Sequence, residues 1–346
     1  MIAAATPLIS IITTFYNEEE LLPRCLQSVK NQSYRNIELL LINDGSTDNS
    51  EKISEDFKTN FINCKIISIE NVGHSEARNI GLQNATGQYI TFLDADDELE
   101  NDMVASCVRK IVDDKSDLVI SNFTIYNQKN LPEMIGGFKS RNQHITHAKD
   151  LQAEMFNNGI SENVWAKLFN TKLAKKIVFE KELWFDDRPF LFEYLFIANK
   201  VSFIDTSLLK IHKRDTSITR RIIEPKRILD GTKVFDLELK IAKKYNKLIK
   251  FKQMIAEHHL NFLVDNFLIQ IIEKNKIQDL KLVRHTLINQ IIIFKNVLVQ
   301  ENISISNKYS IMLHLLHLPI FFGWRFTNFI FRILKRKRMH GILKLK

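Results

Sequence analysis

The sequence is poor in cysteine, with Cys25, Cys64 and Cys107 as the only three among 346 residues. They are scattered, odd in number and without the paired spacing of a zinc site. A disulfide framework and a cysteine metal centre are therefore excluded as organising features. Reduced cysteines are typical of a protein that stays inside the cell, and we expect these three to serve as packing residues.

The sequence also lacks a signal peptide pattern and a clean membrane span. The first twenty residues, MIAAATPLISIITTFYNEEE, have no basic segment before their short apolar run. The apolar tail, residues 309–346, is interrupted by Pro319, Gly323 and Arg325, whereas a membrane-spanning helix needs about twenty uncharged apolar residues. Aromatic residues beside KRKR favour a helix lying in the membrane interface, and a buried terminal helix is the alternative.

Positive charge is scarce in the first part of the chain and abundant in the rest. Residues 1–205 carry 21 Lys and Arg against 30 Asp and Glu, and residues 206–346 carry 28 against 10. A basic half of this kind faces something anionic. Its cations accompany Ile, Leu and Phe at helical spacing, whereas nucleic-acid binding favours basic residues interleaved with aromatics, so we expect an anionic membrane surface and no nucleic acid.

Strand and helix patterns alternate along the first part of the chain. The apolar runs LISIITTF, IELLLIND, KIISIE and GQYITFLDADD are separated by amphipathic helical stretches. This alternation predicts an α/β fold with a mostly parallel sheet covered by helices on both faces. Ligands bind at the carboxyl ends of such strands, and FYN, NDGSTD and DADD all fall at those ends, so the three motifs predict one site.

The chain is longer than one compact core usually takes, which suggests two domains. We expect an α/β domain over residues 1–220, with halves at 1–110 and 111–220, and a long surface loop over 132–160. Beyond Pro225 the periodicity becomes helical, so residues 221–346 are expected to form an α-helical domain.

Three acids are crowded into ITFLDADDE, namely Asp94, Asp96 and Asp97. Like charges at this spacing raise one another's pKa unless a cation lies among them. On an extended chain, Asp94 and Asp96 point to the same side. Two carboxylates aimed at one point suit Mg²⁺ or Mn²⁺, and a set of helix-capping turn residues is the alternative.

Two further charged residues precede this cluster. Asp44 in NDGSTD ends a predicted strand, where its carboxylate can accept a hydrogen bond from a ring N–H or a ribose hydroxyl. Ser46 and Asp48 of the same motif read as turn and helix-capping residues. Arg78 in GHSEARNIG lies on a predicted helix and can hold Asp44 or a phosphate through its planar fork, a surface cation being the alternative.

The stretches SIITTFYNEEELLPRCLQSVKNQSYRNIELLLINDGSTDNS and NVGHSEARNIGLQNATGQYITFLDADD resemble the nucleotide-binding half of family 2 inverting glycosyltransferases, which have the GT-A fold. The match runs almost without gaps. VWAKLF and FDDRPF resemble acceptor-side motifs of the branch that builds bacterial surface polysaccharides and teichoic-acid decorations. Past about residue 220 the resemblance fades.

For the nucleotide, the resemblance implies that Thr14 and Tyr16 border the uracil, with Tyr16 stacking on it. Asp44 would accept from the uracil N–H, and Arg78 would brace that pocket. Asp94 would contact the ribose or a metal-bound water.

For the metal, the resemblance implies that Asp96 binds Mn²⁺ or Mg²⁺ on the diphosphate, while Asp97 matches an acid whose role varies in the family. His212 and Arg214 in KIHKRDTSIT match a segment in which some relatives place a histidine on the metal or a basic residue on the diphosphate. An ordinary surface histidine is the alternative for His212.

For the acceptor, the resemblance implies that Asp187 of FDDRPF is the general base. Asp186 stands where the family usually has Glu. Trp165 and Lys167 of VWAKLF would line the acceptor or donor-sugar region, a core tryptophan with a solvated lysine being the alternative. Two adjacent acids before Pro189 also fit a helix N-terminus.

The sequence therefore predicts a metal-dependent inverting glycosyltransferase. It would move a hexose or N-acetylhexosamine from a UDP-sugar to a glycan or lipid-linked acceptor, peripherally at the inner face of the cytoplasmic membrane, and the helical domain could mediate a homo-oligomer. Two other readings stay open. A nucleotidyltransferase would have a basic Gly-rich loop where the acidic TFYNEEE stands. A non-catalytic subunit would bind polyanions or membrane through the basic half.

Overall fold

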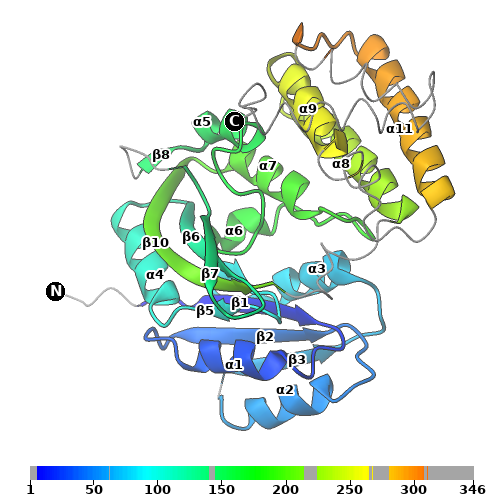
Figure 1. The fold of residues 1–346 in the computed structure, drawn as a ribbon. Helices are drawn as coiled ribbons and strands as arrows, with labels where there is room; N and C mark the ends of the chain where they lie inside the picture. The colour runs from blue at the N-terminus through cyan, green and yellow to red at the C-terminus, as the bar shows by residue number, and fades with distance from the viewer. Residues whose placement is uncertain are drawn as a thin grey trace. The chain divides into compact units, whose positions relative to one another are not determined.

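The computed structural model describes residues 6–61, 63–139, 145–213, 224–264, 267, 280–307 and 310 (Figure 1). They form two compact units, residues 1–217 and 218–346. The strands of the first unit are β1 (Ile9–Phe15), β2 (Ile37–Asn43), β3 (Cys64–Ser68), β4 (Tyr89–Phe92), β5 (Glu98–Leu99), β6 (Leu118–Tyr126), β7 (Pro132–Gly136), β8 (Ile145–His147), β9 (Lys167–Asn170) and β10 (Lys200–His212). Its helices are α1 (Leu22–Lys30), α2 (Ser50–Lys58), α3 (His74–Asn84), α4 (Met103–Asp113), α5 (Ala148–Phe156), α6 (Thr171–Ala174) and α7 (Asp187–Ile197).

All ten strands belong to one sheet, whose main path is β3-β2-β1-β4-β9-β6-β10-β5. The predicted α/β fold is confirmed, and β1 to β4 pair in parallel as expected. The second half of the sheet is mixed, because β9 runs antiparallel to both β4 and β6 whereas β6 and β10 are parallel. The chain moves outward from β1 through β2 to β3 and then returns to the other side of β1 with β4. This reversal is the topological switch point at which α/β sheets bind ligands.

The long surface loop predicted over residues 132–160 is wrong for the described part of that range. It contains β7, which pairs with β6, β8, which pairs with β10, and helix α5. The two strands are short, and their hydrogen-bond partners lie on other segments of the chain. Their local sequence therefore carries little of the information that makes them strands.

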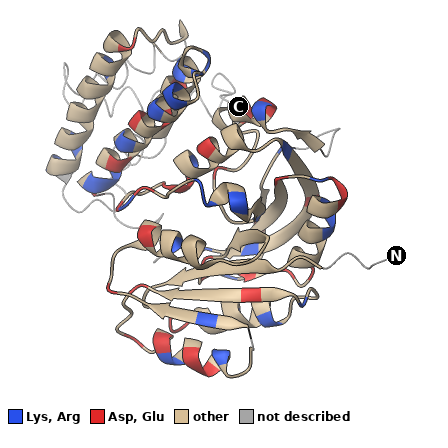
Figure 2. Cartoon of the chain, turned by 180° about the vertical axis from the view of Figure 1, so that it is seen from behind, with Lys and Arg blue, Asp and Glu red and all other residues tan. Residues whose placement is uncertain are grey.

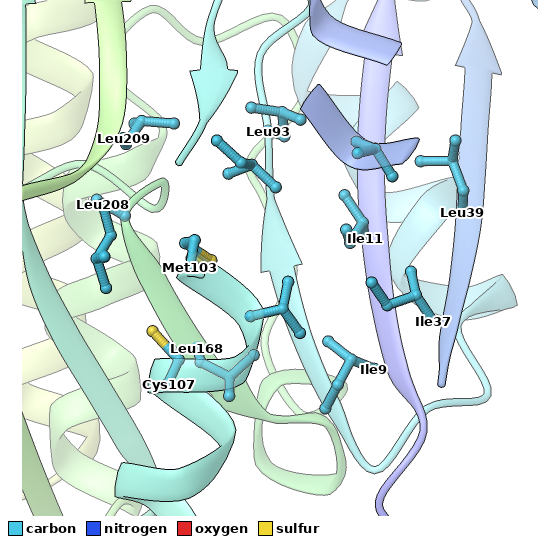
Figure 3. Packing of buried hydrophobic residues seen from close by; sticks show 14 of the residues in the cluster. Ile9, Ile11, Ile37, Leu39, Leu93, Met103, Cys107, Leu168, Leu208 and Leu209 are labelled. Carbon is cyan, nitrogen blue, oxygen red and sulfur yellow. The ribbon is translucent and has the colours of Figure 1, made fainter. Parts of the chain in front are cut away.

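Helices cover both faces of the sheet, as the alternation of strands and helices along the chain predicts. Ile9 and Ile11 of β1 belong to a core cluster that also contains Met103 and Cys107 of α4 (Figure 3). Cys25 belongs to the same cluster and Cys64 packs against it, and all three cysteines are free thiols, so the packing prediction for them is confirmed.

Gly81 sets how closely α3 approaches the opposite face of the sheet. A Cβ added at this position would lie 2.4 Å from Cγ2 of Ile12. Any larger residue would push α3 away from β1. Gly81 thus fixes the depth of the helix that carries Arg78.

A buried carboxylate, Glu38 on β2, fastens the turn that leads into β4. It accepts hydrogen bonds from the backbone N–H groups of Thr86 (2.5 Å) and Gly87 (2.8 Å) and from the hydroxyls of Ser10 and Thr86. Burial alone would raise the pKa of Glu38, but these hydrogen bonds outweigh it and lower the pKa.

Replacing Glu38 with glutamine is expected to lower the free energy of unfolding by about 2–3 kcal/mol. The hydrogen bonds to a charged carboxylate are lost, and the NH₂ group of glutamine faces an N–H or O–H donor that the carboxylate accepted from. A group whose pKa is lowered by folding stabilises the protein above its unfolded pKa and loses that effect as pH falls. Denaturant titrations should therefore show a constant difference between the two proteins near neutral pH that shrinks below about pH 4.5. A difference that widened in acid would contradict the role of the charged form.

In the second unit, the described helices are α8 (Pro225–Lys244), α9 (Leu248–Leu263) and α11 (Leu280–Gln300). Phe235 packs edge-on against Phe294 at 5.1 Å and stacks on His259 at 4.8 Å, so aromatic rings join the three helices. This helical character agrees with the prediction. Residues 309 and 311–346 of the expected tail, and the expected boundary near residue 220, lie outside the described residues.

Charged side chains gather on helices and loops, and the strands of the sheet are mostly uncharged (Figure 2). Within the described residues, one helix, Lys281–Gln300, is long and apolar enough to cross a membrane by length and composition alone. A third of its apolar window is buried, and core helices of other proteins pass the same test.

Candidate active site

Three of the predicted site residues follow neighbouring parallel strands. Tyr16 comes directly after β1, Asp44 after β2 and Asp94 shortly after β4. The Tyr16 side chain is 46% exposed, which leaves an aromatic face open to a ligand. Because β1 pairs with both β2 and β4, these three carboxyl ends meet at one edge of the sheet.

The Asp44 carboxylate is buried beneath the start of α3. Its two oxygens accept hydrogen bonds from the backbone N–H groups of Val72 (2.8 Å) and Gly73 (3.1 Å). Burial raises the pKa of Asp44, and these two hydrogen bonds partly offset the increase. Gly73 precedes α3 with a φ of +89°, a conformation that glycine adopts without strain.

The loops after β1 and β2 are tied together by side chains. The backbone N–H groups of Asn17, Glu18 and Glu19 donate to Ser46, Ser50 and Asp48 respectively, at 2.8–3.1 Å. In return, Asn17 accepts from the backbone N–H of Thr47 at 2.8 Å. These hydrogen bonds therefore fix the loop after β1, which carries Tyr16, against the loop that follows Asp44.

Sequence reasoning overlooked His74, the first residue of α3. Its Nδ1 lies 3.5 Å from the hydroxyl of Thr14. One ring nitrogen of His74 and one oxygen from each of Asp186 and Asp187 lie within 4.8 Å of one another. The sequence could have pointed to His74, because it lies four residues before Arg78 in GHSEARNIG and residues at that spacing share one face of a helix.

The acidic cluster of Asp94, Asp96 and Asp97 is a turn and not the extended strand that the alternation argument assumed. β4 ends at Phe92, and the N–H of Asp97 donates to the carbonyl oxygen of Asp94 at 3.1 Å. The turn still gathers the acids, since one oxygen from each of the three carboxylates lies within 4.8 Å of the others. The convergence therefore comes from turn geometry and includes Asp97.

The three carboxylates fit a hard divalent cation. Burial first, and then the charges of Asp96 and Asp94, raise the pKa of Asp97 well above its ordinary value. Asp97 Oδ1 is buried and has no hydrogen-bond partner among the described residues. A cation bound here would supply the missing partner, and an all-oxygen donor set is the kind that Mg²⁺ and Mn²⁺ favour.

Arg78 lies at the centre of the site, 3% exposed, and pairs with three carboxylates. Its guanidinium is 3.1 Å from Asp94 and 3.5 Å from Asp186, and it also forms a close ion pair with Asp187. Burial would lower the pKa of Arg78, but the three carboxylates raise it above its ordinary value. Arg78 thus joins the acidic turn to α7, whereas the sequence predicted that it would brace the Asp44 pocket.

Asp186 and Asp187 lie at the N-terminus of α7. The two interpretations of this acid pair, as a helix start and as site residues, are therefore compatible. Asp187 also accepts a hydrogen bond from the backbone N–H of Val164 at 3.1 Å. Asp186 is 4% exposed, and burial raises its pKa to about 7 although Arg78 opposes the increase. Phe185 precedes the pair with a φ of +68°, a strained conformation of the kind that clusters at functional sites.

Lys167 opens β9 and is 1% exposed, which differs from a solvated lysine. Burial lowers the pKa of Lys167 to about 7, and the charges of Asp187 and Glu162 oppose the decrease. Trp165 is partly buried, with its ring edge-on to Phe123 at 4.6 Å. Ala166 between them has a φ of +55°, so this segment is strained as well.

His212 ends β10 with Nε2 2.6 Å from Glu98, and its ring stacks on Tyr126. Glu98 also pairs with Arg24 at 3.1 Å, and Arg24 donates to the carbonyl oxygen of Asp96 at 2.7 Å. These contacts place His212 next to the acidic turn. Arg214 lies outside the described residues.

Comparisons with known proteins agree with this architecture. Residues 10–169 match the family model described as Glycosyl transferase family 2. Glycosyltransferase GlyA of Streptococcus pneumoniae is 31% identical over 226 residues, which cover 61% of this chain and 31% of GlyA. Glycosyltransferase GlyG of the same organism is 28% identical over 272 residues, which cover 73% of this chain and 90% of GlyG.

A solved structure, S. aureus TarS 1–349 in complex with UDP-GlcNAc, is similar with a TM-score of 0.71. The superposition covers 95% of this chain and 92% of that structure, at 19% sequence identity. At this identity the likeness establishes a shared fold, including a helical part after the α/β unit.

Proposed function

We propose that this chain is a member of glycosyl transferase family 2, of the type that builds surface polysaccharides, and that it transfers a hexose or N-acetylhexosamine from a UDP-sugar, with inversion, to a hydroxyl of a glycan or lipid-linked acceptor. One observation carries this proposal. An open aromatic ring, a buried carboxylate and a cluster of three aspartates lie at the adjoining carboxyl ends of β1, β2 and β4. The complex of TarS with UDP-GlcNAc supports a UDP-sugar donor.

In this proposal Tyr16 and Asp44 recognise the uracil. The ring of Tyr16 offers a stacking face, with Thr14 beside it. A carboxylate has about four acceptor positions. The backbone N–H groups of Val72 and Gly73 use two of them, so Asp44 can still accept from the uracil N–H.

Asp94, Asp96 and Asp97 are proposed to hold Mn²⁺ or Mg²⁺. When bound, the cation would offset the negative charge of the donor diphosphate. The chain contributes the oxygen ligands and fixes them through the turn, which Arg24 braces by its bond to the Asp96 carbonyl oxygen. Arg78 keeps Asp94 paired on its other side.

Asp187 is proposed as the general base. The oxygen of the acceptor hydroxyl forms a bond to the anomeric carbon, its proton passes to the Asp187 carboxylate, and the bond to UDP breaks with its electron pair on the diphosphate. Arg78 and the N–H of Val164 hold the two oxygens of Asp187 in place. Buried Lys167 balances charge beside Asp187, while Asp186 and Trp165 border the acceptor side.

The second unit is proposed to keep the enzyme at the inner face of the cytoplasmic membrane. Residues 218–346 carry 25 Lys and Arg against 9 Asp and Glu, a balance that attracts anionic lipid. The apolar character of α11 supports the same reading. A homo-oligomer formed through this unit stays a prediction.

Calorimetric titration with nucleotides tests the donor site. In the presence of Mn²⁺, the wild type should bind UDP and bind CDP more weakly. Uracil can donate a hydrogen bond from its ring N3–H to the Asp44 carboxylate, whereas N3 of cytosine carries no hydrogen. Tyr16→Ala should raise the dissociation constant for UDP about tenfold, since base stacking contributes about 1–3 kcal/mol. Asp44→Asn should reduce the preference for UDP over CDP.

Tyr245→Ala, in the second unit, is the matched aromatic control and should bind UDP like the wild type. Equal affinities of the wild type for UDP and CDP would argue against the uracil contact. Binding of UDP that is unchanged in Tyr16→Ala would remove Tyr16 from the donor site.

A further inference from the structure

A pocket of about 360 Å³ is lined in part by Asn163, the residue before Val164, whose N–H bonds to Asp187. It is lined by the end of β7 and by residues 137–139, 158 and 160–163. Its volume falls within the roughly 300–1,000 Å³ typical of small-molecule sites. None of the residues assigned above to the donor, the cation or the base lines it.

The pocket is built by two segments that pair with each other. Phe138 and Ile160 form an antiparallel bridge, the N–H of Lys139 donates to the carbonyl oxygen of Gly159 at 2.9 Å, and that of Ser161 donates to Gly137. The two walls therefore stand at a fixed separation.

Glycine is required where the first wall leaves β7. A Cβ at Gly136 would lie 2.3 Å from the Phe123 ring, and one at Gly137 would lie 2.5 Å from Asn122 Oδ1. Gly137 also has a φ of +127°, which disfavours any other residue. These two positions allow the wall to lie directly on β6 and keep the pocket open.

The lining is mixed, polar and apolar, and carries no net charge. Asn158, Ser161 and Asn163 offer amide and hydroxyl groups, Phe138 and Ile160 offer apolar surface, and Lys139 and Glu162 contribute one charge of each sign. Ser161 donates to Asn163 Oδ1 at 2.7 Å, which orients that amide and leaves its N–H groups to act as donors. Neutral polar groups beside apolar patches match a sugar ring, which presents hydroxyls at its rim and C–H groups on its faces.

One wall of the pocket leads along the chain into the segment that holds the proposed base. Asn163 immediately precedes Val164, whose N–H donates to Asp187 at 3.1 Å. Glu162 pairs with Arg188, the residue after Asp187, at 3.2 Å. A group seated over Asn163 is thus one residue away from the segment that positions the base.

We propose that this pocket binds the acceptor through a neutral, hydroxyl-bearing glycosyl residue, and that Asn163 is a specificity-determining contact. Its assignment to the acceptor rests on the proposed transfer reaction. The absence of net charge among the lining residues favours a neutral sugar over a phosphate-bearing group, for which a surplus of cations would be expected.

Saturation-transfer NMR on the full chain, with methyl glycosides of glucose, galactose and N-acetylglucosamine as probes, tests the pocket without requiring turnover. At least one glycoside should receive saturation from the wild type, and the signal should fall at least threefold in Asn163→Ala. Asn163→Asp keeps a side-chain oxygen that can accept from the Ser161 hydroxyl but loses the N–H donors of the amide, so its signal should resemble that of Asn163→Ala. Gln128→Ala, exposed on the loop between β6 and β7, is the control and should match the wild type.

No saturation of any glycoside, equal signals from wild type and Asn163→Ala, or stronger binding of glycerol 3-phosphate than of the glycosides would overturn the proposal. Turnover of UDP-sugars separates it from the transferase assignment. A protein that hydrolyses a UDP-sugar but binds no glycoside refutes the pocket alone. A protein that binds glycosides through Asn163 but turns over no UDP-sugar retains the sugar pocket and refutes the transferase.

Discussion

Replacing Asp187 with asparagine is expected to lower kcat for sugar transfer by about 10²–10⁴-fold, the usual contribution of a general base. Asparagine has nearly the shape of aspartate but cannot take the proton of the acceptor hydroxyl. Because Tyr16, Asp44 and the acidic turn are untouched, UDP should bind within about threefold of the wild type, which is less than 1 kcal/mol. Initial rates of product formation and calorimetry with UDP measure the two quantities.

Asp186→Asn is the matched control for this variant. It removes the same charge beside the same Arg78, at the neighbouring residue, and tests whether charge alone matters. Its rate should fall much less than that of Asp187→Asn. Transfer by Asp187→Asn at more than a tenth of the wild-type rate would remove Asp187 as the base. Equal losses in the two variants would mean that Arg78 needs both charges and that no single base has been identified.

Replacing Arg78 with methionine should have the largest effect on stability. Its guanidinium is 3% exposed and pairs with Asp94, Asp186 and Asp187, so its loss removes the one buried partner that the three carboxylates share. Breaking a buried ion pair by removing one partner costs about 3–5 kcal/mol. Chemical denaturation should show a loss of this size, and transfer activity should disappear because the base and the acidic turn lose their common partner.

The pH dependence of this loss follows from the carboxylates. Burial already raises the pKa of Asp186 to about 7, and removing the cation raises it further. A carboxyl whose pKa is raised by folding lowers stability as pH rises from its unfolded pKa to its folded pKa. The wild type therefore stops losing stability from Asp186 near pH 7, whereas Arg78→Met continues to lose it, so the deficit should be largest above about pH 7 and shrink in mild acid.

Arg109→Met, on the exposed side of α4, is the control and should change the free energy of unfolding by less than about 0.5 kcal/mol. Arg78→Lys should lie between the wild type and Arg78→Met, because an ammonium keeps the charge but cannot fork among three carboxylates. A fully stable Arg78→Met protein would contradict the central position given to this guanidinium.

The strands and the acids at their ends could be predicted from sequence because both depend on local patterns. Apolar runs such as IELLLIND read as buried strands, and Asp44 and Asp94 follow such runs directly. The parallel pairing of β1 to β4 followed from the helices between them. These features require no knowledge of which distant residues come together.

The partners of Arg78 could not be predicted, because they depend on long-range packing. Asp187 lies 109 residues further along the chain and reaches Arg78 only once α7 has packed onto the sheet. The burial of Lys167 depends on the neighbouring strands in the same way. The turn at Asp94–Asp97 was not predicted because the alternation argument required an extended chain through Asp96, whereas β4 ends at Phe92.

The central claim is that the acidic turn holds a cation for a UDP-sugar. Its most direct test is UDP release from a panel of UDP-sugars, with Mn²⁺ or with a chelator, by the wild type and Asp96→Ala. The account predicts slow hydrolysis of at least one donor by the wild type with Mn²⁺, and none with chelator or with Asp96→Ala. Release that is equally fast with chelator, or undiminished in Asp96→Ala, would contradict the cation site, and no release from any UDP-sugar would contradict the donor assignment.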